Sequence, residues 1–404
     1  MLNEKEIDKL IQPLINTQVK LESQVIDIIA NRLKELGTIL PSDVYSLTRL
    51  FKTGSDARRI NKLLSKASNL SVKQIKSIIK EVAQDAYEAA KPFYDYRHKS
   101  FISFEDNFVL RDTIKAIERV TLGEYVRLSN TSAFMLRDIT NPLILRPTPV
   151  SQVYNKVIDE GIQSVVSGIS TYDKVIKDTI ANLTNSGITA VDYTTESGKP
   201  HRVRLDSAVR GHILNGVRNV QQEVDRVTGE QFGADGIELS VHQYSAPDHE
   251  PVQGHQFTLE EFDNMQNGKS CVDVNNNLFY GFERPIGMWN CRHIAMHIII
   301  GHKTPNYTDK QLEMIKKKNA NGITIKDKDG NDVTKSKYWC TQKRNDYELK
   351  LRKLKEAQKA AETAQQPDLA DKYTSKIKQM QDKYIQFCKS AGIETRFENT
   401  RIFV

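Results

Sequence analysis

The sequence predicts an α+β fold that is predominantly α-helical. It has a helical N-terminal half, a small α+β core with short strands and hairpins, and a C-terminal antiparallel helical hairpin. Three observations predict this fold. Apolar residues recur at helical spacing in the first third of the chain, short alternating runs between Gly- and Pro-rich turns occupy the middle, and a coiled-coil-like repeat closes it. A chain of 404 residues is long enough for two or three domains, which we place at 1–145, 146–335 and 336–404.

The N-terminal domain is expected to consist of amphipathic helices. The expected helices cover 6–36, a short segment from Pro41, 71–93 and 106–128. Pro13 is expected to kink or restart the first of them, and Gly37 is a suitable C-cap. Apolar stripes of this kind usually pack against one another, so we interpret them as core.

The middle of the chain is expected to begin with a linker. Three prolines within 138–152 indicate a break between domains. Three helices are expected after it, over 151–168, over 171–186 and from Asp206 or Ser207, as N-cap, to about Glu230. The inner face of the third helix is expected to consist of Val209, Ile213, Val217, Val220 and Val224.

Short strands are expected around these helices. Ser197–Gly198 separates two alternating runs and predicts a hairpin, and Asp329–Gly330 predicts another. Ile237, Leu239 and Val241 alternate along the chain and predict a short strand.

The C-terminal domain is expected to be a basic helical hairpin. Its arms are Trp339–Gln365 and Leu369–Ala391, with Pro367 between them and Gly392 at the end. Tyr347, Leu351 and Leu354 are expected to pack on Tyr373, Ile377 and Met380, because the second arm repeats apolar residues at intervals of three and four. The segment 335–404 holds 16 Lys and Arg against 9 Asp and Glu, which accounts for the whole net charge of +7. Such a surface is either solvated or in contact with a polyanion.

A loop-rich segment, 245–304, and its flank carry cysteine and histidine. His242, His249, Cys291 and His293 are the residue types that hold structural zinc, and Cys291 and His293 lie two apart. A second interpretation stays open. The segment has no CxxC pair, a free cysteine is often a small buried hydrophobe, and histidines are often hydrogen-bonded within a core.

The sequence favours no enzyme. It contains no GxxxxGK[ST], GxSxG or HExxH motif. Cys291 and His293 resemble a nucleophile and base, but a catalytic histidine normally comes from elsewhere in the chain. No apolar run is long enough to suggest a membrane segment, and the four scattered cysteines indicate folding in a reducing cytoplasm.

Two stretches resemble a known family. "IELSVHQYSAPDHEPVQGHQF" at Ile237–Phe257 and "GMWNCRH" at Gly287–His293 are similar to the paired motifs of the phage minor capsid protein 2 family. "YTDKQL" at Tyr307–Leu312 and the basic hairpin follow in the order seen in that family. The motif positions with an expected structural role are Gly254, Trp289, Asn290 and Arg292. The family more distantly resembles head-morphogenesis proteins of the phage Mu F type, but Ala246 stands here where those proteins have a first cysteine, which weakens the zinc interpretation.

The resemblance implies a minor capsid protein of the virion, present in few copies inside the head and made in the host cytoplasm. It implies a place near the portal, a role in head morphogenesis or DNA ejection, and binding to the portal protein, the major capsid protein or both. One alternative is a sequence-independent DNA-binding protein of the head interior, and a second is a hydrolase or toxin-like enzyme. The residues expected to contact packaged double-stranded DNA are Lys343, Arg344, Lys350, Arg352, Lys353, Lys355, Lys376, Lys378 and Lys383.

Overall fold

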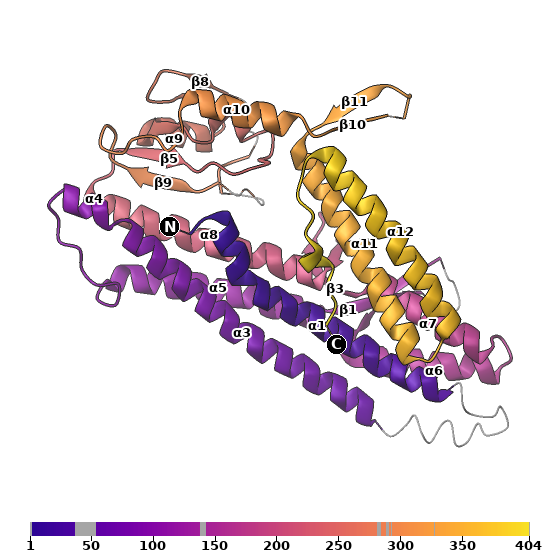
Figure 1. Ribbon diagram of the computed structural model, residues 1–404. Coiled ribbons are helices and arrows are strands. Elements are labelled where there is room, and N and C mark those ends of the chain that lie inside the picture. The colour runs from indigo at the N-terminus through magenta and orange to yellow at the C-terminus, as the bar shows by residue number, and fades with distance from the viewer. Residues whose placement is uncertain are drawn as a thin grey trace.

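The computed structural model confirms a predominantly helical α+β fold (Figure 1). It describes residues 2–36, 54–137, 143–280, 284–287, 291, 293–326 and 328–403. Long helices lie side by side along the body, a unit of short strands covers one end of them, and a helical hairpin packs near the other end (Figure 1). The expected helix from Pro41 and the expected cap at Gly37 lie outside the described residues.

The N-terminal body consists of helices, as expected. They are α1 (Glu4–Leu36), α3 (Ser55–Ala89), α4 (Lys91–Tyr96), α5 (Phe108–Asn130), α6 (Val150–Val166) and α7 (Tyr172–Ser186). The first of these continues through Pro13, so the proline does not restart the helix. No helix in the described part of the chain is both long enough and apolar enough to cross a lipid bilayer.

Helix α8 (Leu205–Phe232) is the central element of the molecule. Its expected inner face is confirmed, since Val209, Ile213, Val217, Val220 and Val224 are all buried. This face packs against α1, α3 and α5 and completes the main hydrophobic core.

The expected N-cap of α8 is wrong. The helix begins one residue before Asp206, and Arg204 occupies the cap position. Asp206 instead lies buried in the first turn, where its carboxylate binds Arg352 of the C-terminal hairpin.

A four-stranded antiparallel sheet closes one end of the body. The strands are β1 (Ala133–Arg137), β2 (Leu145–Pro149), β3 (Ile188–Thr194) and β4 (Pro200–Arg204), in the order β2-β1-β3-β4. The turn at Ser197–Gly198 is confirmed. Strand β2 lies within the expected linker and pairs with β1, so the expected boundary at 145/146 falls inside a sheet. The division into three domains therefore stays a prediction.

A second unit of short strands lies over α8. Its three-stranded sheet has the order β6-β5-β9, with β5 (Gly236–Leu239) between β6 (Gln256–Thr258) and β9 (Ala295–Ile298). Around this sheet lie η1 (Glu250–Val252), α9 (Leu259–Gln266), β7 (Cys271–Val272), β8 (Leu278–Phe279) and α10 (Asp309–Ala320).

The expected short strand at 237–241 is confirmed as β5. All four residues of β5 are buried, because α9 contacts this strand and α8 contacts its neighbour β9. Glu238 is the polar member of the strand, and its carboxylate accepts hydrogen bonds from Gln256 and Asn306.

The C-terminal hairpin is confirmed. Its arms are α11 (Lys337–Thr363) and α12 (Pro367–Ala391), and Gly392 caps the second arm in the left-handed conformation. A β-hairpin of β10 (Ile323–Lys326) and β11 (Asp332–Lys335) precedes it, and η2 (Phe397–Thr400) follows. The expected seam residues share one apolar cluster, except that Tyr373 packs against the main core.

Buried charges join this hairpin to the body. We call Glu22, Arg204, Asp206, Arg352 and Glu356 the buried ionic cluster, since each is at most 9% exposed. Arg204 binds Glu22 at 2.5 Å and Arg352 binds Asp206 at 2.5 Å. The cluster therefore connects α1, the start of α8 and α11.

Candidate metal centre

The topology of the small sheet brings two distant loops together. Leu239 at the end of β5 pairs with Ala295 at the start of antiparallel β9. The loop after β5 and the loop before β9 consequently leave the sheet at the same edge. Ser240 and Ile294 continue the contact, with Ser240 N–H donating to the Ile294 carbonyl at 2.9 Å and Ile294 N–H donating to Ser240 Oγ at 2.8 Å.

Three of the four expected zinc ligands meet at this edge. Cys291 Sγ lies 3.2 Å from His249 Nδ1 and 3.5 Å from His293 Nδ1. The three ligand atoms all lie within 4.8 Å of one another, and none of the three residues is more than 2% exposed. The structure thus confirms the expected clustering of these residues.

The outer nitrogens of both histidines contact oxygen atoms. His249 Nε2 donates to the Arg284 carbonyl at 2.6 Å, and the Arg284 guanidinium binds the neighbouring Asp248 carboxylate at 2.8 Å. His293 Nε2 lies 3.4 Å from Gln253 Oε1, which also accepts the backbone N–H of His242. These contacts direct both Nδ1 atoms toward the sulfur. Gln253 and Arg284 could not be predicted, because nothing in a single sequence shows which side chain or carbonyl will lie behind a histidine.

The electrostatics of the cluster favour metal-binding protonation states for two of its members. Burial raises the pKa of Cys291, but the interaction with His249 and the hydrogen bonds from the backbone of Gly287 and His293 together outweigh it and leave the pKa below that of an ordinary thiol. Burial and the nearby His242 hold the pKa of His293 well below its usual value, so this ring is neutral. Burial lowers the pKa of His249, yet its contacts with Cys291 and the Arg284 carbonyl raise it overall. A thiolate and neutral imidazoles are the forms that bind metals.

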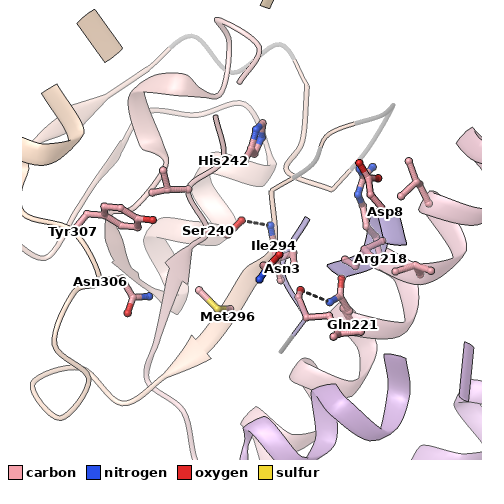
Figure 2. A pocket seen from close by; sticks show the side chains of 15 residues that line it. Asn3, Asp8, Arg218, Gln221, Ser240, His242, Ile294, Met296, Asn306 and Tyr307 are labelled. Carbon is pink, nitrogen blue, oxygen red and sulfur yellow. Dashed lines mark hydrogen bonds between the residues drawn. The ribbon is translucent and has the colours of Figure 1, made fainter. Parts of the chain in front are cut away.

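His242, the fourth expected ligand, lies beside the cluster and outside the group of three. Its ring centroid is 4.3 Å from that of His293. His242 also lines a cavity of about 500 Å³ between the small sheet, the start of α1 and α8. Figure 2 shows His242 and Ser240 on the sheet side of this cavity, with Asp8 and Arg218 across from them.

Gly254 has a structural reason to be glycine. Its φ of +78° is in the left-handed region, and a Cβ atom there would lie 2.6 Å from Leu312 and 2.8 Å from Val241. Its N–H donates to the Leu239 carbonyl, so the loop turns tightly back to the sheet. The other expected motif residues, Trp289, Asn290 and Arg292, lie outside the described residues.

Two of the nine expected DNA-contact residues are buried, so their expected position on an outer face is wrong. Arg352 binds Asp206, and Arg344 donates to the Glu394 carbonyl and lies 3.4 Å from Glu348. The reason is that α11 packs on α1 and α7 and is also covered by η2, which buries a second face of this helix.

The remaining seven lysines differ in exposure. Lys353 donates to the Asn185 carbonyl and Lys355 to Thr400 Oγ1, and burial lowers the pKa of both. Lys343 is half-buried, 3.5 Å from Asp346. The fully exposed members are Lys350, Lys376, Lys378 and Lys383.

Comparison with known proteins identifies the family. No curated protein and no solved structure matches the chain. The family described as Phage minor capsid protein 2 matches residues 2–389, which include the helical body, the candidate metal centre and both arms of the hairpin. Because the match spans nearly the whole chain and all of these parts, the protein belongs to the phage minor capsid protein 2 family and is a structural protein of a phage virion.

Proposed function

We propose that this protein is a low-copy component of the phage head that lies inside it near the portal and acts in head assembly or DNA delivery. In this proposal it works by binding the portal protein, the major capsid protein or both, and not by catalysis. The family supports a virion protein that contacts other virion components. The observation that carries the binding role is an exposed apolar face on α5.

This face, the α5 ridge, consists of Val109, Ala116, Val120 and Gly123, and the exposed side chains of Phe108 and Val126 lie beside it. Val109 and Val120 are 67% and 66% exposed, although valine is usually buried. Val109, Ala116, Val120 and Gly123 follow intervals of seven, four and three residues, as in the seam of packed helices. Apart from its own stretch of helix, no atom of the described residues lies within 4 Å of a Cβ placed on Gly123, so another backbone has room to approach there. An exposed apolar stripe of this kind indicates a protein-binding surface.

The double substitution Val109→Lys and Val120→Lys is expected to reduce incorporation into virions at least about tenfold, since two desolvated charges in an interface cost well over 1.4 kcal/mol. Stability should change little, because both side chains are exposed. The measurement is the amount of this protein relative to the major capsid protein in purified virions, by quantitative mass spectrometry. The matched control places lysines at exposed Ser375 and Gln379 of α12. Equal incorporation of both double variants would remove the α5 ridge from the proposal.

Chemical cross-linking of intact virions tests the proposed position. Lys115 lies on α5 with 62% of its side chain exposed, which makes it a suitable reactive group beside the ridge. A cross-link from Lys115 to the portal or major capsid protein supports the proposal. Cross-links from this lysine only to other copies of this chain would contradict it.

Contact with DNA is a second candidate function, favoured by the four exposed lysines of the hairpin. Lys350, Lys376, Lys378 and Lys383 are exposed in a segment that carries the whole net charge of the chain. Their charge is partly balanced by neighbouring Asp371 and Asp382 on α12, which favours weak binding without base readout.

The binding of duplex DNA of random sequence is therefore expected to depend steeply on salt. Four phosphate contacts predict a slope of log affinity against log salt of roughly −3.5. Replacing the four lysines with glutamine should bring the slope close to zero. The control replaces Lys62, Lys66, Lys73 and Lys80, four exposed lysines of α3, and removes the same charge. If the salt dependence of DNA affinity falls equally in both variants, the binding reflects the total charge of the protein and not a site on the hairpin.

A further inference from the structure

We propose that His249, Cys291 and His293 hold a structural zinc ion, bound through the two Nδ1 atoms and the cysteine sulfur. Such an ion would join the loop after β5 to the loop before β9. Four features of the molecule support this site. They are the spacing of the ligand atoms, the number of protons between them, the atoms that contact the outer nitrogens of the two histidines, and the small size of the surrounding core.

The spacing fits a tetrahedral ion. Zinc bonds of about 2.0–2.3 Å place neighbouring ligand atoms about 3.3–3.8 Å apart in a tetrahedron. The two measured edges, from Cys291 Sγ to the Nδ1 atoms of His249 and His293, are 3.2 and 3.5 Å. The third edge is at most 4.8 Å, so small side-chain rotations suffice to close the site.

A count of protons shows that hydrogen bonds alone do not satisfy the cluster. A carbonyl oxygen only accepts, so the contact with Arg284 places a proton on His249 Nε2. Gln253 Oε1 already accepts a backbone N–H and therefore also accepts from His293 Nε2. One proton then lies between the sulfur and the two Nδ1 atoms, either on Cys291 Sγ or on His249 Nδ1, and in both cases the lone pair of His293 Nδ1 or of His249 Nδ1 is left without a donor. A zinc ion accepts both nitrogen lone pairs and the thiolate at once.

The atoms behind the ligands match those of metal sites. Metal-binding histidines usually donate their other ring N–H to a carbonyl or carboxylate, which fixes the tautomer. Here the acceptors are the Arg284 carbonyl and Gln253 Oε1. The mixed nitrogen and sulfur ligands favour zinc over magnesium or calcium, which prefer oxygen.

The small unit has little other means of holding its loops. In the described part of this unit the apolar core consists of nine buried residues, and the strands contain two to four residues each. Cores of this size often depend on metals or disulfides for stability. All four cysteines are described and none forms a disulfide, which leaves a metal as the cross-link this unit can form.

The test uses the full-length protein, stripped of metal with a chelator and then titrated with Zn²⁺. We expect one equivalent to bind and the Tm to rise by at least about 5 °C, since binding to the folded state alone stabilises it. Titration with Co²⁺ should give tetrahedral visible bands and a thiolate-to-cobalt absorption in the near ultraviolet. Less than about a tenth of an equivalent of bound Zn²⁺ would overturn the site. Co²⁺ binding without the thiolate absorption would also overturn the site, and this outcome can be observed with the wild-type protein.

A pair of cysteine variants gives the matched comparison. Cys271 is 1% exposed and belongs to the same core as Cys291, but it lies outside the ligand group, and burial raises the pKa of its thiol to about 11. Cys271→Ser is expected to keep one equivalent of zinc and the zinc-induced rise in Tm. Cys291→Ser is expected to lose both the thiolate absorption and most of the rise. Equal zinc binding and equal stabilisation in the two variants would overturn the proposal.

Discussion

Replacing Arg352 with methionine is expected to lower the free energy of unfolding by about 3–5 kcal/mol, because it leaves a buried carboxylate without its partner. Arg352 Nη2 lies 2.5 Å from Asp206 Oδ2, and both residues are buried. Burial raises the pKa of Asp206, but Arg352 and Arg204 lower it below its usual value, so the carboxylate is charged in the folded protein. Methionine preserves most of the side-chain volume, so the loss reports on charge rather than on a cavity.

Chemical denaturation of the wild type and three variants tests this result. Lys350→Met, on the exposed side of the same helix, removes the same charge and should change the unfolding free energy by less than about 0.5 kcal/mol. The double variant Asp206→Asn with Arg352→Met should be more stable than Arg352→Met alone, because it also removes the buried charge. Equal losses in Arg352→Met and Lys350→Met would show that the ion pair contributes little.

Glu356 is expected to make the protein less stable as the pH rises from about 5 to 8. Burial, and next the neighbouring Glu22, raise the pKa of Glu356 to about 7, while an unfolded glutamate titrates near about 4.3. Between these two values the folded protein holds one proton more than the unfolded chain, so raising the pH favours unfolding. The loss is complete above pH 7 and amounts to the order of 3 kcal/mol.

The variant Glu356→Gln should remove this dependence. It is expected to match the wild type near pH 5 and to exceed its stability at pH 8, where the wild type carries a buried charge close to Glu22. The control is Glu362→Gln, an exposed position on the same helix, whose difference from the wild type should not change with pH. Denaturation curves at several pH values provide the measurement. A difference between Glu356→Gln and the wild type that stays constant with pH would contradict the assignment.

Most helices could be predicted from the sequence. A helix with one buried face repeats apolar residues every three or four positions, whichever element packs against that face. The apolar positions of α8 show this, since all five expected inner residues are buried. The polar residues buried between elements could not be predicted in this way. The residues next to Arg352 in the sequence do not distinguish it from an exposed basic residue, and its partner Asp206 lies 146 positions earlier in the chain.

The strand β2 was interpreted as part of a linker because it contains Pro147 and Pro149. A strand in the middle of a sheet donates backbone hydrogen bonds to both neighbouring strands. Proline has no N–H to donate, so it argues against a strand in general. In this fold β2 is the edge strand of its sheet, where proline is tolerated. The position of a strand within a sheet depends on distant pairing and cannot be read from the segment itself.

The candidate metal centre was partly predictable for a different reason. Cysteine and histidine are uncommon residues whose chemistry restricts their use, so His249, Cys291 and His293 could be selected by type alone. Their clustering depends on the pairing of β5 with β9, which the sequence did not predict. His242 lies beside this group of three residues and not in it, and this position depends on the conformation of the loop after β5.

The buried ionic cluster also has a consequence for the order of events during synthesis. Ser23 on α1 donates a hydrogen bond to Glu356, which lies 333 positions later in the chain. At about 5–20 residues per second, a ribosome needs roughly 20–70 s to make the intervening segment. During that time the polar face of α1 has no access to its partners on α11, so this part of the helical body stays incomplete until α11 has been made. Until then Asp206 lacks Arg352 and has only Arg204, 3.6 Å away, to balance its charge, so synthesis of α11 is the step that completes the buried ionic cluster.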